Sequence, residues 1–292
     1  MDAILNINKQ LGWTSFDVVA KIRRIVNEKR VGHAGTLDPF AKGVLPVFMG
    51  RATSLIQYSD IGFKKYRATI CFGVATDTYD ATGDVLSKRD ASKLTRRHLE
   101  GLLPRYTGLI LQTPPAYSAL KVGGTPSYKL ARKGKAPVLA AREVDIQSIS
   151  IVEWRQGEAV LDVECGSGTY IRSLAHDIGE EIGCGAHLRA LVRIAVGPFR
   201  IEQAKTVEEV ANSFAGGRHA DVLLGADFAL RLPRLEITPV ELNDLSFGRT
   251  IVLKNEILDK GSLCSAYLEG GAFKGLLKRL PAGDLAVVKL LS

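Results

Sequence analysis

The hydrophobic and polar positions along the chain change period several times, and each change predicts a different element. Apolar residues dominate 4–8, which predicts a short strand. Over 18–26 they recur every three or four positions beside a basic opposite side, which predicts an amphipathic helix. Thr14 precedes this helix, and its spacing to Asp17 matches a capping box. The helix therefore begins at Thr14 or the next residue.

Strict alternation of apolar and polar residues takes over at 65–73. It places Tyr66, Ala68, Ile70 and Phe72 on one face of a predicted strand. A polar turn, TDTYDATGDV, follows it. Further strands are predicted at 143–154, 159–165 and 192–199, and further helices at 92–103, at 127–134, from Ile171 to Ile182 and within 206–230.

These elements indicate an α+β protein with a mixed or antiparallel central sheet flanked by helices and loops. Regular alternation of strands and helices is missing, which argues against a Rossmann fold. Beyond about residue 230, glycines divide the chain into short apolar runs, which predicts a small β-rich appendage. We therefore expect a large domain over 1–230 and a small second domain over 231–292.

The positive charge of the chain is concentrated in one part of it. The formal net charge of the 292 residues is +8, while 233–292 hold eight basic and seven acidic residues. The segment 121–142 has six basic residues and no acidic one. A polyanion is the partner that such a cluster favours, because each phosphate it neutralises releases condensed counterions. A merely solvated basic surface is the alternative.

Several function classes are disfavoured by composition. The N-terminal residues lack the basic and then apolar pattern of a signal peptide, and no apolar run reaches the roughly 20 residues of a membrane helix. The four cysteines have no CxxC pairing, which predicts reduced thiols and no zinc site. We expect a cytoplasmic protein that neither enters a membrane nor holds a metal.

The stretch GHAGTLDPFAKGVLP places one carboxylate, Asp38, in a glycine-rich bend. Asp38 followed by Pro39 is a good start for a helix, so one interpretation is a simple helix cap. Gly35 and Gly43 favour the alternative of a reactive group on a sharp bend that a ligand approaches closely. Neither phosphate-loop motif is present, so a nucleotide-phosphate site is disfavoured.

Two further stretches carry candidate chemistry. In GSGTYIR, an extended backbone would place Tyr170 and Arg172 on the same face. The alternative is a core tyrosine and a surface cation. In KKYRA, Tyr66 leads the apolar face of a predicted strand, and a tyrosine at the rim of that strand is again the simpler interpretation. The residues alone leave these alternatives open.

Together the motifs resemble the bacterial TruB family, the tRNA pseudouridine-55 synthases. The resemblance rests on the blocks GHAGTLDPFAKGVLP, KKYRATICFG, TDTYDATGDV, PPAYSALKVGG, GTYIRSLAHDIGEEIGCGAHLRAL and VGPF, in family order and spacing. It covers about residues 4–200 closely and the rest loosely. It implies a pseudouridine synthase fold with a reduced PUA-like C-terminal domain. It also implies isomerisation of one uridine in the T loop of tRNA, with no cofactor and no metal.

The resemblance also assigns roles within this sequence. Asp38 matches the catalytic carboxylate, and attack on C1′, removal of the C2′ proton and addition to C6 all remain open for it. Arg172 matches the arginine that keeps this carboxylate ionised and oriented. The matched substrate-binding residues are Tyr66, which stacks on the base, Tyr170, which faces it and assists the final removal of a proton, Leu191, which closes the pocket, and His33, which fills the gap left by the flipped nucleotide.

The same resemblance makes the T arm of tRNA the expected partner of a monomeric enzyme. The insertion over about 105–142 matches a loop that closes over the RNA. One departure is Ser54, where the family often has a lysine, which puts one phosphate or polar contact in question. A rival interpretation is a tRNA-folding helper, a role that coexists with catalysis. A metal site at Asp77, Asp80 and Asp84 is disfavoured, because the spacing misses the EF-hand pattern.

Overall fold

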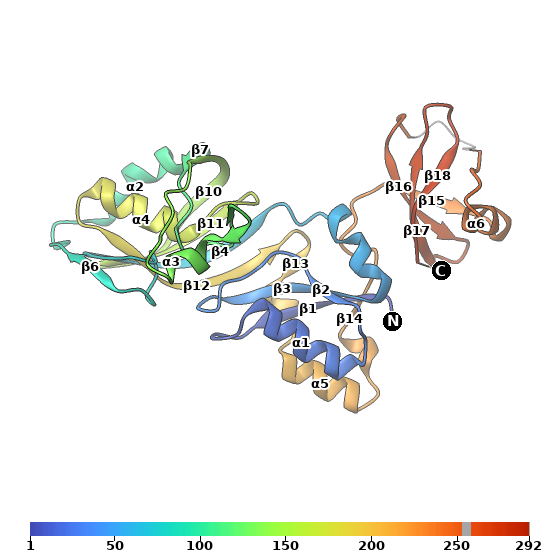
Figure 1. Cartoon of the computed structure of the whole chain (residues 1–292), viewed down its shortest axis with the longest axis horizontal. Coiled ribbons are helices and arrows are strands. Elements are labelled where there is room, and N and C mark those ends of the chain that lie inside the picture. The colour runs from blue at the N-terminus through green and yellow to red at the C-terminus, as the bar shows by residue number, and fades with distance from the viewer. Residues whose placement is uncertain (253–257, 292) are drawn as a thin grey trace.

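The computed structural model describes residues 1–252 and 258–291 and contains a large mixed sheet and a separate small one (Figure 1). This confirms the α+β class and the β-rich C-terminal part. The strands of the large sheet are β1 (Ala3–Lys9), β2 (Val31–His33), β3 (Lys42–Met49), β4 (Lys64–Phe72), β7 (Gly108–Gln112), β10 (Arg142–Arg155), β11 (Glu158–Cys165), β12 (Ala186–Val196), β13 (Phe199–Arg200) and β14 (Leu223–Gly225).

The remaining elements are helices, two short hairpins and the small sheet. The hairpins pair β5 (Val74–Thr76) with β6 (Val85–Lys88), and β8 (Lys121–Val122) with β9 (Thr125–Pro126). The small sheet has β15 (Arg234–Ile237), β16 (Leu263–Leu268), β17 (Phe273–Arg279) and β18 (Leu285–Leu290). The α-helices are α1 (Ser15–Val26), α2 (Arg96–Leu102), α3 (Ser127–Ala131), α4 (Ile171–Ile182), α5 (Val207–Ala215) and α6 (Pro239–Ser246), and 3-10 turns include Gly50–Tyr58.

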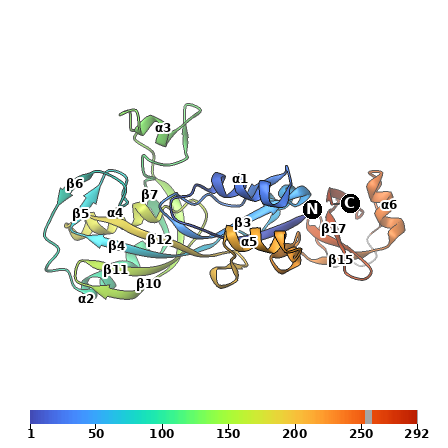
Figure 2. The same ribbon diagram turned by 90° about the horizontal axis from the view of Figure 1, so that it is seen from below.

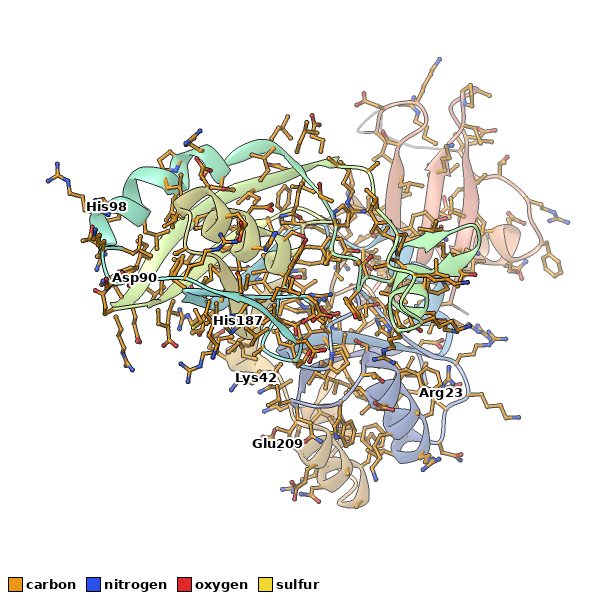
Figure 3. All side chains as sticks on the ribbon, turned by 60° about the vertical axis from the view of Figure 1, so that its left-hand side comes forward. Arg23, Lys42, Asp90, His98, His187 and Glu209 are labelled. Carbon is orange, nitrogen blue, oxygen red and sulfur yellow. The ribbon has the colours of Figure 1, made fainter. Side chains whose placement is uncertain are left out.

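The large sheet joins two halves at one parallel seam. Its strand order is β14-β1-β3-β12-β4-β11-β10-β7, and β3 pairs with β12 in parallel through Lys42 with Val192 and Gly43 with Arg193. Figure 3 labels Lys42, the first residue of β3, together with His187 on β12 and Glu209 on α5. The segment that carries Asp38 connects β2 to β3 and therefore lies at this seam.

The half of the sheet around β1 is buried on both faces. Alternate side chains of a strand point to opposite faces, and Leu5 and Ile7 pack with apolar residues of α1 and α5. Ile4 points the other way, into a cluster that includes Leu276 of the small sheet. The predicted capping box of α1 is present at Thr14, which confirms the start of this helix.

The other half of the sheet packs against α4. Its cluster contains Leu174 and Ile178 from the helix and the alternating residues of β4. All four of those β4 residues are buried, as the alternation predicts. Each Å² of apolar surface that is buried contributes about 25 cal/mol to the free energy of folding. The contact between α4 and the sheet is therefore a main source of stability for this half of the molecule.

The structure decides two of the alternatives that the sequence left open. Asp38 does not cap a helix, because the chain turns at Pro39 and continues as β3 rather than as a helical turn. Arg172 does not lie on an extended strand with Tyr170. Tyr170 is the extended N-cap of α4, and Arg172 is in its first turn. The helix begins at Ile171, as its apolar spacing predicts, so the extended arrangement of Tyr170 and Arg172 does not occur.

The basic insertion stands away from the rest of the ribbon (Figure 2). It consists of the β8–β9 hairpin and α3, and its base is held where the Ser127 hydroxyl donates to the Ala116 carbonyl at 2.5 Å. The backbone N–H of Tyr128 donates to the carbonyl of Ser118 at 3.0 Å. The exposed cations of this insertion are Lys121, Lys129, Arg132, Lys133 and Lys135.

The small sheet lies at one end of the molecule (Figure 1) and has its own apolar cluster. It also contacts the body of the protein, since Leu276 packs in the same cluster as Phe48. The hydroxyl of Tyr267 donates to a carboxylate oxygen of Asp227 at 2.7 Å. Residues 253–257 and 292 of the expected second domain lie outside the described residues.

The seam predicts a strong glycine requirement at residue 43. Gly43 has φ +112°, and a Cβ there would collide with the backbone of Arg193. Gly43→Ala should therefore lower the free energy of unfolding by about 2–4 kcal/mol in urea denaturation. Gly101→Ala is the control, because Gly101 is an exposed residue of α2 with open space around it. It should raise stability by about 0.5–1 kcal/mol. Equal stabilities of the two variants would contradict the seam constraint.

Candidate active site

The loop that carries Asp38 is fixed from beneath by a buried arginine. Arg193 of β12 is completely buried, and its Nε donates to the carbonyl of Val44 at 2.8 Å. Its Nη2 donates to the carbonyl of Gly35 at 3.0 Å, and its Nη1 to that of Thr36 at 3.3 Å. One guanidinium thus ties both ends of the loop to the sheet.

The start of α1 fixes the same loop from its other side. The Ser15 hydroxyl accepts from the N–H of Leu37 at 2.9 Å, and the N–H of Gly12 donates to the carbonyl of Pro39 at 2.8 Å. Lys9 lies beneath them, fully buried, and donates to the carbonyl of Trp13 at 2.6 Å. Burial lowers the pKa of Lys9 to about 8, while the negative charge of Asp38 acts in the opposite direction.

Asp38 and Arg172 meet, as the family resemblance implies. Nη2 of Arg172 lies 2.9 Å from Oδ2 of Asp38. The arginine side chain is only 7% exposed, whereas that of Asp38 is 39% exposed. The guanidinium therefore anchors the pair in the protein, while the carboxylate remains accessible to a ligand. A charge-assisted contact of this kind fixes the direction of the carboxylate.

A second carboxylate, Asp80, holds the far side of Arg172. Its Oδ2 lies 3.4 Å from Nη1 of the arginine, and its side chain is 4% exposed. Arg172 also donates to the carbonyls of Thr78, at 3.3 Å, and Tyr117, at 2.9 Å. Removing one partner of such a buried pair costs about 3–5 kcal/mol, because the other charge is left uncompensated. Asp80 thus positions the arginine that positions Asp38.

The turn that carries Asp80 is itself braced against α4. Oδ1 of Asp80 accepts from the backbone N–H of Thr82 at 2.9 Å and from its hydroxyl at 2.6 Å. Tyr79 has φ 62°, an unfavourable value for a residue other than glycine. Its ring stacks on His176, with centroids 3.8 Å apart and planes at 8°. His176 is one helical turn after Arg172, so both residues face this turn.

A pocket of ≈ 260 Å³ opens beside the Asp38 carboxylate. Five of the six predicted site residues line it, namely Asp38, Tyr66, Tyr170, Arg172 and Leu191. Other residues that the sequence did not indicate for the site also line it, among them Lys64, Ser118 and Thr169. The pocket is formed by the start of β4, the loop between β11 and α4, the start of α4, the middle of β12, the loop before β3 and the chain just before β8.

The two tyrosines of the pocket have different environments. Tyr66 is 8% exposed, and burial raises the pKa of its phenol, so the group stays neutral. Tyr170 is half-buried, and its N–H donates to Oε1 of Gln112 at 2.7 Å. The guanidinium of Arg142 lies over the Tyr170 ring, 5.1 Å from the centroid. Both rings are held by contacts outside the pocket.

His33 lies on β2 and is absent from the lining of the pocket. Burial lowers the pKa of its imidazole, and the positive charge of Arg193 lowers it further. The neutral form is therefore favoured at pH 7. Its Nδ1 is buried without a hydrogen-bond partner among the described residues. Its assignment to substrate binding rests on the family motif rather than on contact with the pocket.

Asp80, Lys64 and Arg193 are the structural contacts of this site that sequence reasoning missed. Asp80 belongs to the TDTYD turn, whose polar character was visible, although we expected only a turn there. Asp77 accepts from the hydroxyl of Tyr117 at 3.0 Å. In residues 1–252 and 258–291, no group of three or more potential ligand side chains is placed to hold a metal ion. Neither Arg51 nor Ser54 lines the pocket.

Comparisons with known proteins agree on one family. The N-terminal domain of the TruB family pseudouridylate synthases matches residues 23–171, and the C-terminal domain of tRNA pseudouridylate synthase B matches residues 172–231. The tRNA pseudouridine synthase B of Dehalococcoides mccartyi (strain CBDB1) is 41% identical over 279 residues, which are 95% of this chain and 92% of that protein. That of Symbiobacterium thermophilum is 50% identical over 214 residues, 72% of each chain.

The fold is also found in solved structures. A chain in the crystal structure of a Cbf5-Nop10-Gar1 complex aligns with a TM-score of 0.75 at 24% identity, over 99% of this chain and 85% of its own. Fold and family matches together define a pseudouridine synthase. The chain belongs to the TruB family. Among the described helices, none is long and apolar enough to span a membrane.

The brace on Arg172 predicts a specific defect when Asp80 loses its charge. Asp80→Asn should lower kcat by about 10- to 100-fold, because a misplaced Arg172 misdirects the Asp38 carboxylate. The affinity for RNA should change little. Asp84→Asn is the matched control, since Asp84 is exposed on the same turn. Single-turnover rates and filter binding measure the two effects. An Asp80→Asn rate equal to that of Asp84→Asn would exclude the brace.

The neighbouring Asp177 on α4 predicts a pH-dependent stability. Burial raises the pKa of Asp177 from 3.8 to about 6. The folded state holds the proton of Asp177 more tightly than the unfolded state does. The stability associated with this proton is therefore fully present below pH 3.8 and is lost as the pH rises through 6. Asp177→Asn should raise the Tm at pH 8 by about 2–4 °C, the shift that about 1 kcal/mol produces in a domain of this size. The gain should shrink as the pH is lowered towards 4, and a gain independent of pH would be inconsistent with this cause.

Proposed function

We propose that this protein converts uridine 55 in the T loop of tRNA to pseudouridine, with Asp38 as the catalytic residue. The observation that supports the proposal most directly is the Asp38 carboxylate on the wall of the pocket, 2.9 Å from a buried guanidinium. An accessible carboxylate oriented by a buried cation suits a nucleophile or base that must be ionised. Its relatives of this length are named tRNA pseudouridine synthase B.

Substrate binding begins with extrusion of the target base from the loop. Taking a base out of its stack costs a few kcal/mol, and stacking on an aromatic ring returns about 1–3 kcal/mol. Tyr66 supplies that ring, Tyr170 faces it, and Leu191 closes the apolar side of the pocket. The neutral imidazole of His33 occupies the gap that the extruded nucleotide leaves, outside the pocket itself.

The reaction only rearranges bonds. The N1–C1′ bond breaks, the uracil turns within the pocket, C5 bonds to C1′, and the C5 proton is lost while N1 regains one. Substrate and product are isomers, so the scheme includes no electron acceptor and no cofactor. Asp38 attacks C1′, removes the C2′ proton or adds to C6, and in each route it starts as the anion. Arg172 and Asp80 hold that anion in place, and the Tyr170 phenol assists loss of the C5 proton.

The parts outside the pocket bind the RNA. The exposed cations of the insertion, within about 105–142, neutralise phosphates of the T arm. The catalytic domain comprises residues 1–230, and the PUA-like domain, 231–292, adds a second RNA contact. This chain supplies Asp38, Arg172 and both tyrosines of the pocket, and the proposed enzyme acts as a monomer. A cytoplasmic location follows from tRNA as substrate.

Release of tritium tests this function. Unmodified tRNA carrying tritium at C5 of uracil should lose the label when the wild-type protein is added, because the C5 proton leaves during the reaction. Asp38→Asn should abolish release and leave the Kd for tRNA within about twofold of wild type, since the amide preserves the size of the side chain. Asp84→Asn again serves as the control for an exposed carboxylate.

The same assay separates catalysis from a tRNA-folding role. A folding helper would refold tRNA in the Asp38→Asn variant as well as in wild type, without release of tritium. Release from wild type that requires U55, shown with a tRNA in which this uridine is replaced by cytidine, establishes the position. Absence of release from any tRNA by the intact protein would refute the proposed activity.

A further inference from the structure

Lys64 is a pocket cation that the mechanism above does not use. It begins β4, two residues before Tyr66, so the two side chains point to the same face of the strand. Both line the pocket beside Asp38. Along a strand, two residues span about 6.6 Å. Lys64 therefore extends the stacking surface of Tyr66 towards the rim of the pocket, where Ser167 is exposed.

The hydrogen bonds of Lys64 leave its charge uncompensated. Its Nζ donates to the hydroxyl of Ser167 at 2.9 Å and to the carbonyl of Gly62 at 3.3 Å. Both acceptors are neutral, and an ammonium group has three N–H donors. Among the described residues, no carboxylate forms an ion pair with Lys64. Burial lowers the pKa of Lys64, and the positive charge of Arg193 adds to this effect. An anion bound at this position would offset the effects of burial and of the Arg193 charge on the Lys64 ammonium.

The other cation of the pocket is already neutralised. Arg172 contacts Asp38 and Asp80, and Arg193, beneath the floor, is engaged by three carbonyls. The pocket thus has one lining cation, Lys64, with no acidic partner in the described part of the chain. A flipped nucleotide brings its base to Tyr66, while its phosphates stay at the rim.

We propose that Lys64 binds one of the two phosphates that flank the target uridine. This contact positions the flipped nucleotide relative to the Asp38 carboxylate. The contact forms only when the base has entered the pocket, because only then does its own phosphate reach the rim beside Tyr66. Lys64 is therefore a substrate-binding residue specific for the extruded state. This inference rests on the proposed function, since it takes the T-loop uridine as the ligand.

Lys65 provides a matched control on the same strand. Its side chain is 43% exposed, points to the opposite face, and lies 4.0 Å from Asp162. Lys64→Met and Lys65→Met are each combined with Asp38→Asn, so that binding is measured without turnover. Lys64→Met should weaken binding of a T-loop RNA about tenfold and reduce the slope of log K against log[salt] by about 0.7–0.9. Lys65→Met should stay within about twofold, and Lys64→Arg should restore most of the affinity.

A neutral phosphate identifies the contact independently of protein folding. T-loop RNAs with a methylphosphonate at the 5′ or the 3′ phosphate of the target uridine lack one charge each. One of them should bind the Asp38→Asn protein about tenfold more weakly, and should lose nothing further with Lys64→Met. Fully additive losses for both RNAs would overturn the inference. A Lys64→Met variant that binds the T-loop RNA as tightly as its parent would overturn it as well.

The two proposals fail in distinguishable ways. Absence of tritium release by the wild-type protein would refute the proposed function whatever Lys64 does. Normal release by wild type, together with a Lys64→Met variant that responds to both methylphosphonates as its parent does, would refute the phosphate contact alone. Thermal melting of each variant shows whether it is folded, and the comparison between the two methylphosphonate RNAs uses one and the same protein.

Discussion

The structure around the pocket depends on one buried cation, Arg172. A guanidinium that is 7% exposed has to be surrounded by acceptors, and it recruits them from distant parts of the chain. Asp38 comes from the loop before β3, Asp80 from the turn after β5, and the Tyr117 carbonyl from the base of the insertion. The need to compensate one charge therefore brings together Asp38, its brace Asp80 and the base of the basic insertion.

Electrostatic asymmetry within this group gives each carboxylate a different role. Asp80 is 4% exposed and saturated by hydrogen bonds from its own turn, so it is a fixed counterion. Asp38 is 39% exposed and shares the same arginine, so it keeps oxygen lone pairs for a substrate. Burial and hydrogen bonding thus make one of two chemically identical groups a structural counterion and leave the other accessible to a ligand. Tyr79, which has a positive φ and stacks on His176, places an unfavourable backbone conformation beside the structural member.

The sequence predicted those parts of the fold in which burial repeats with a regular period. Alternation along β4 and helical spacing along α1 and α4 reflect which side chains face the core, and these elements agree with the structure. The conformation around Asp38 and Pro39 stayed open at the level of the sequence, because this loop is held by tertiary contacts with Arg193 and Ser15. The pairing of Asp38 with Arg172 came from the family motifs, since no local pattern encodes a contact across so many residues. Arg193 left no signal at all, because its partners are backbone carbonyls, which every residue has.

That last property has a consequence for how this loop can vary. Arg193 recognises the main chain at Gly35, Thr36 and Val44 and ignores the side chains there. Substitutions at Thr36 and Val44 that respect local packing leave the clamp intact, whereas a change at Arg193 removes it for every loop sequence at once. The geometry of the loop backbone is in this sense independent of the side chains that the loop carries. One buried donor that binds only main-chain carbonyls can hold loops of different sequence around Asp38 in the same geometry.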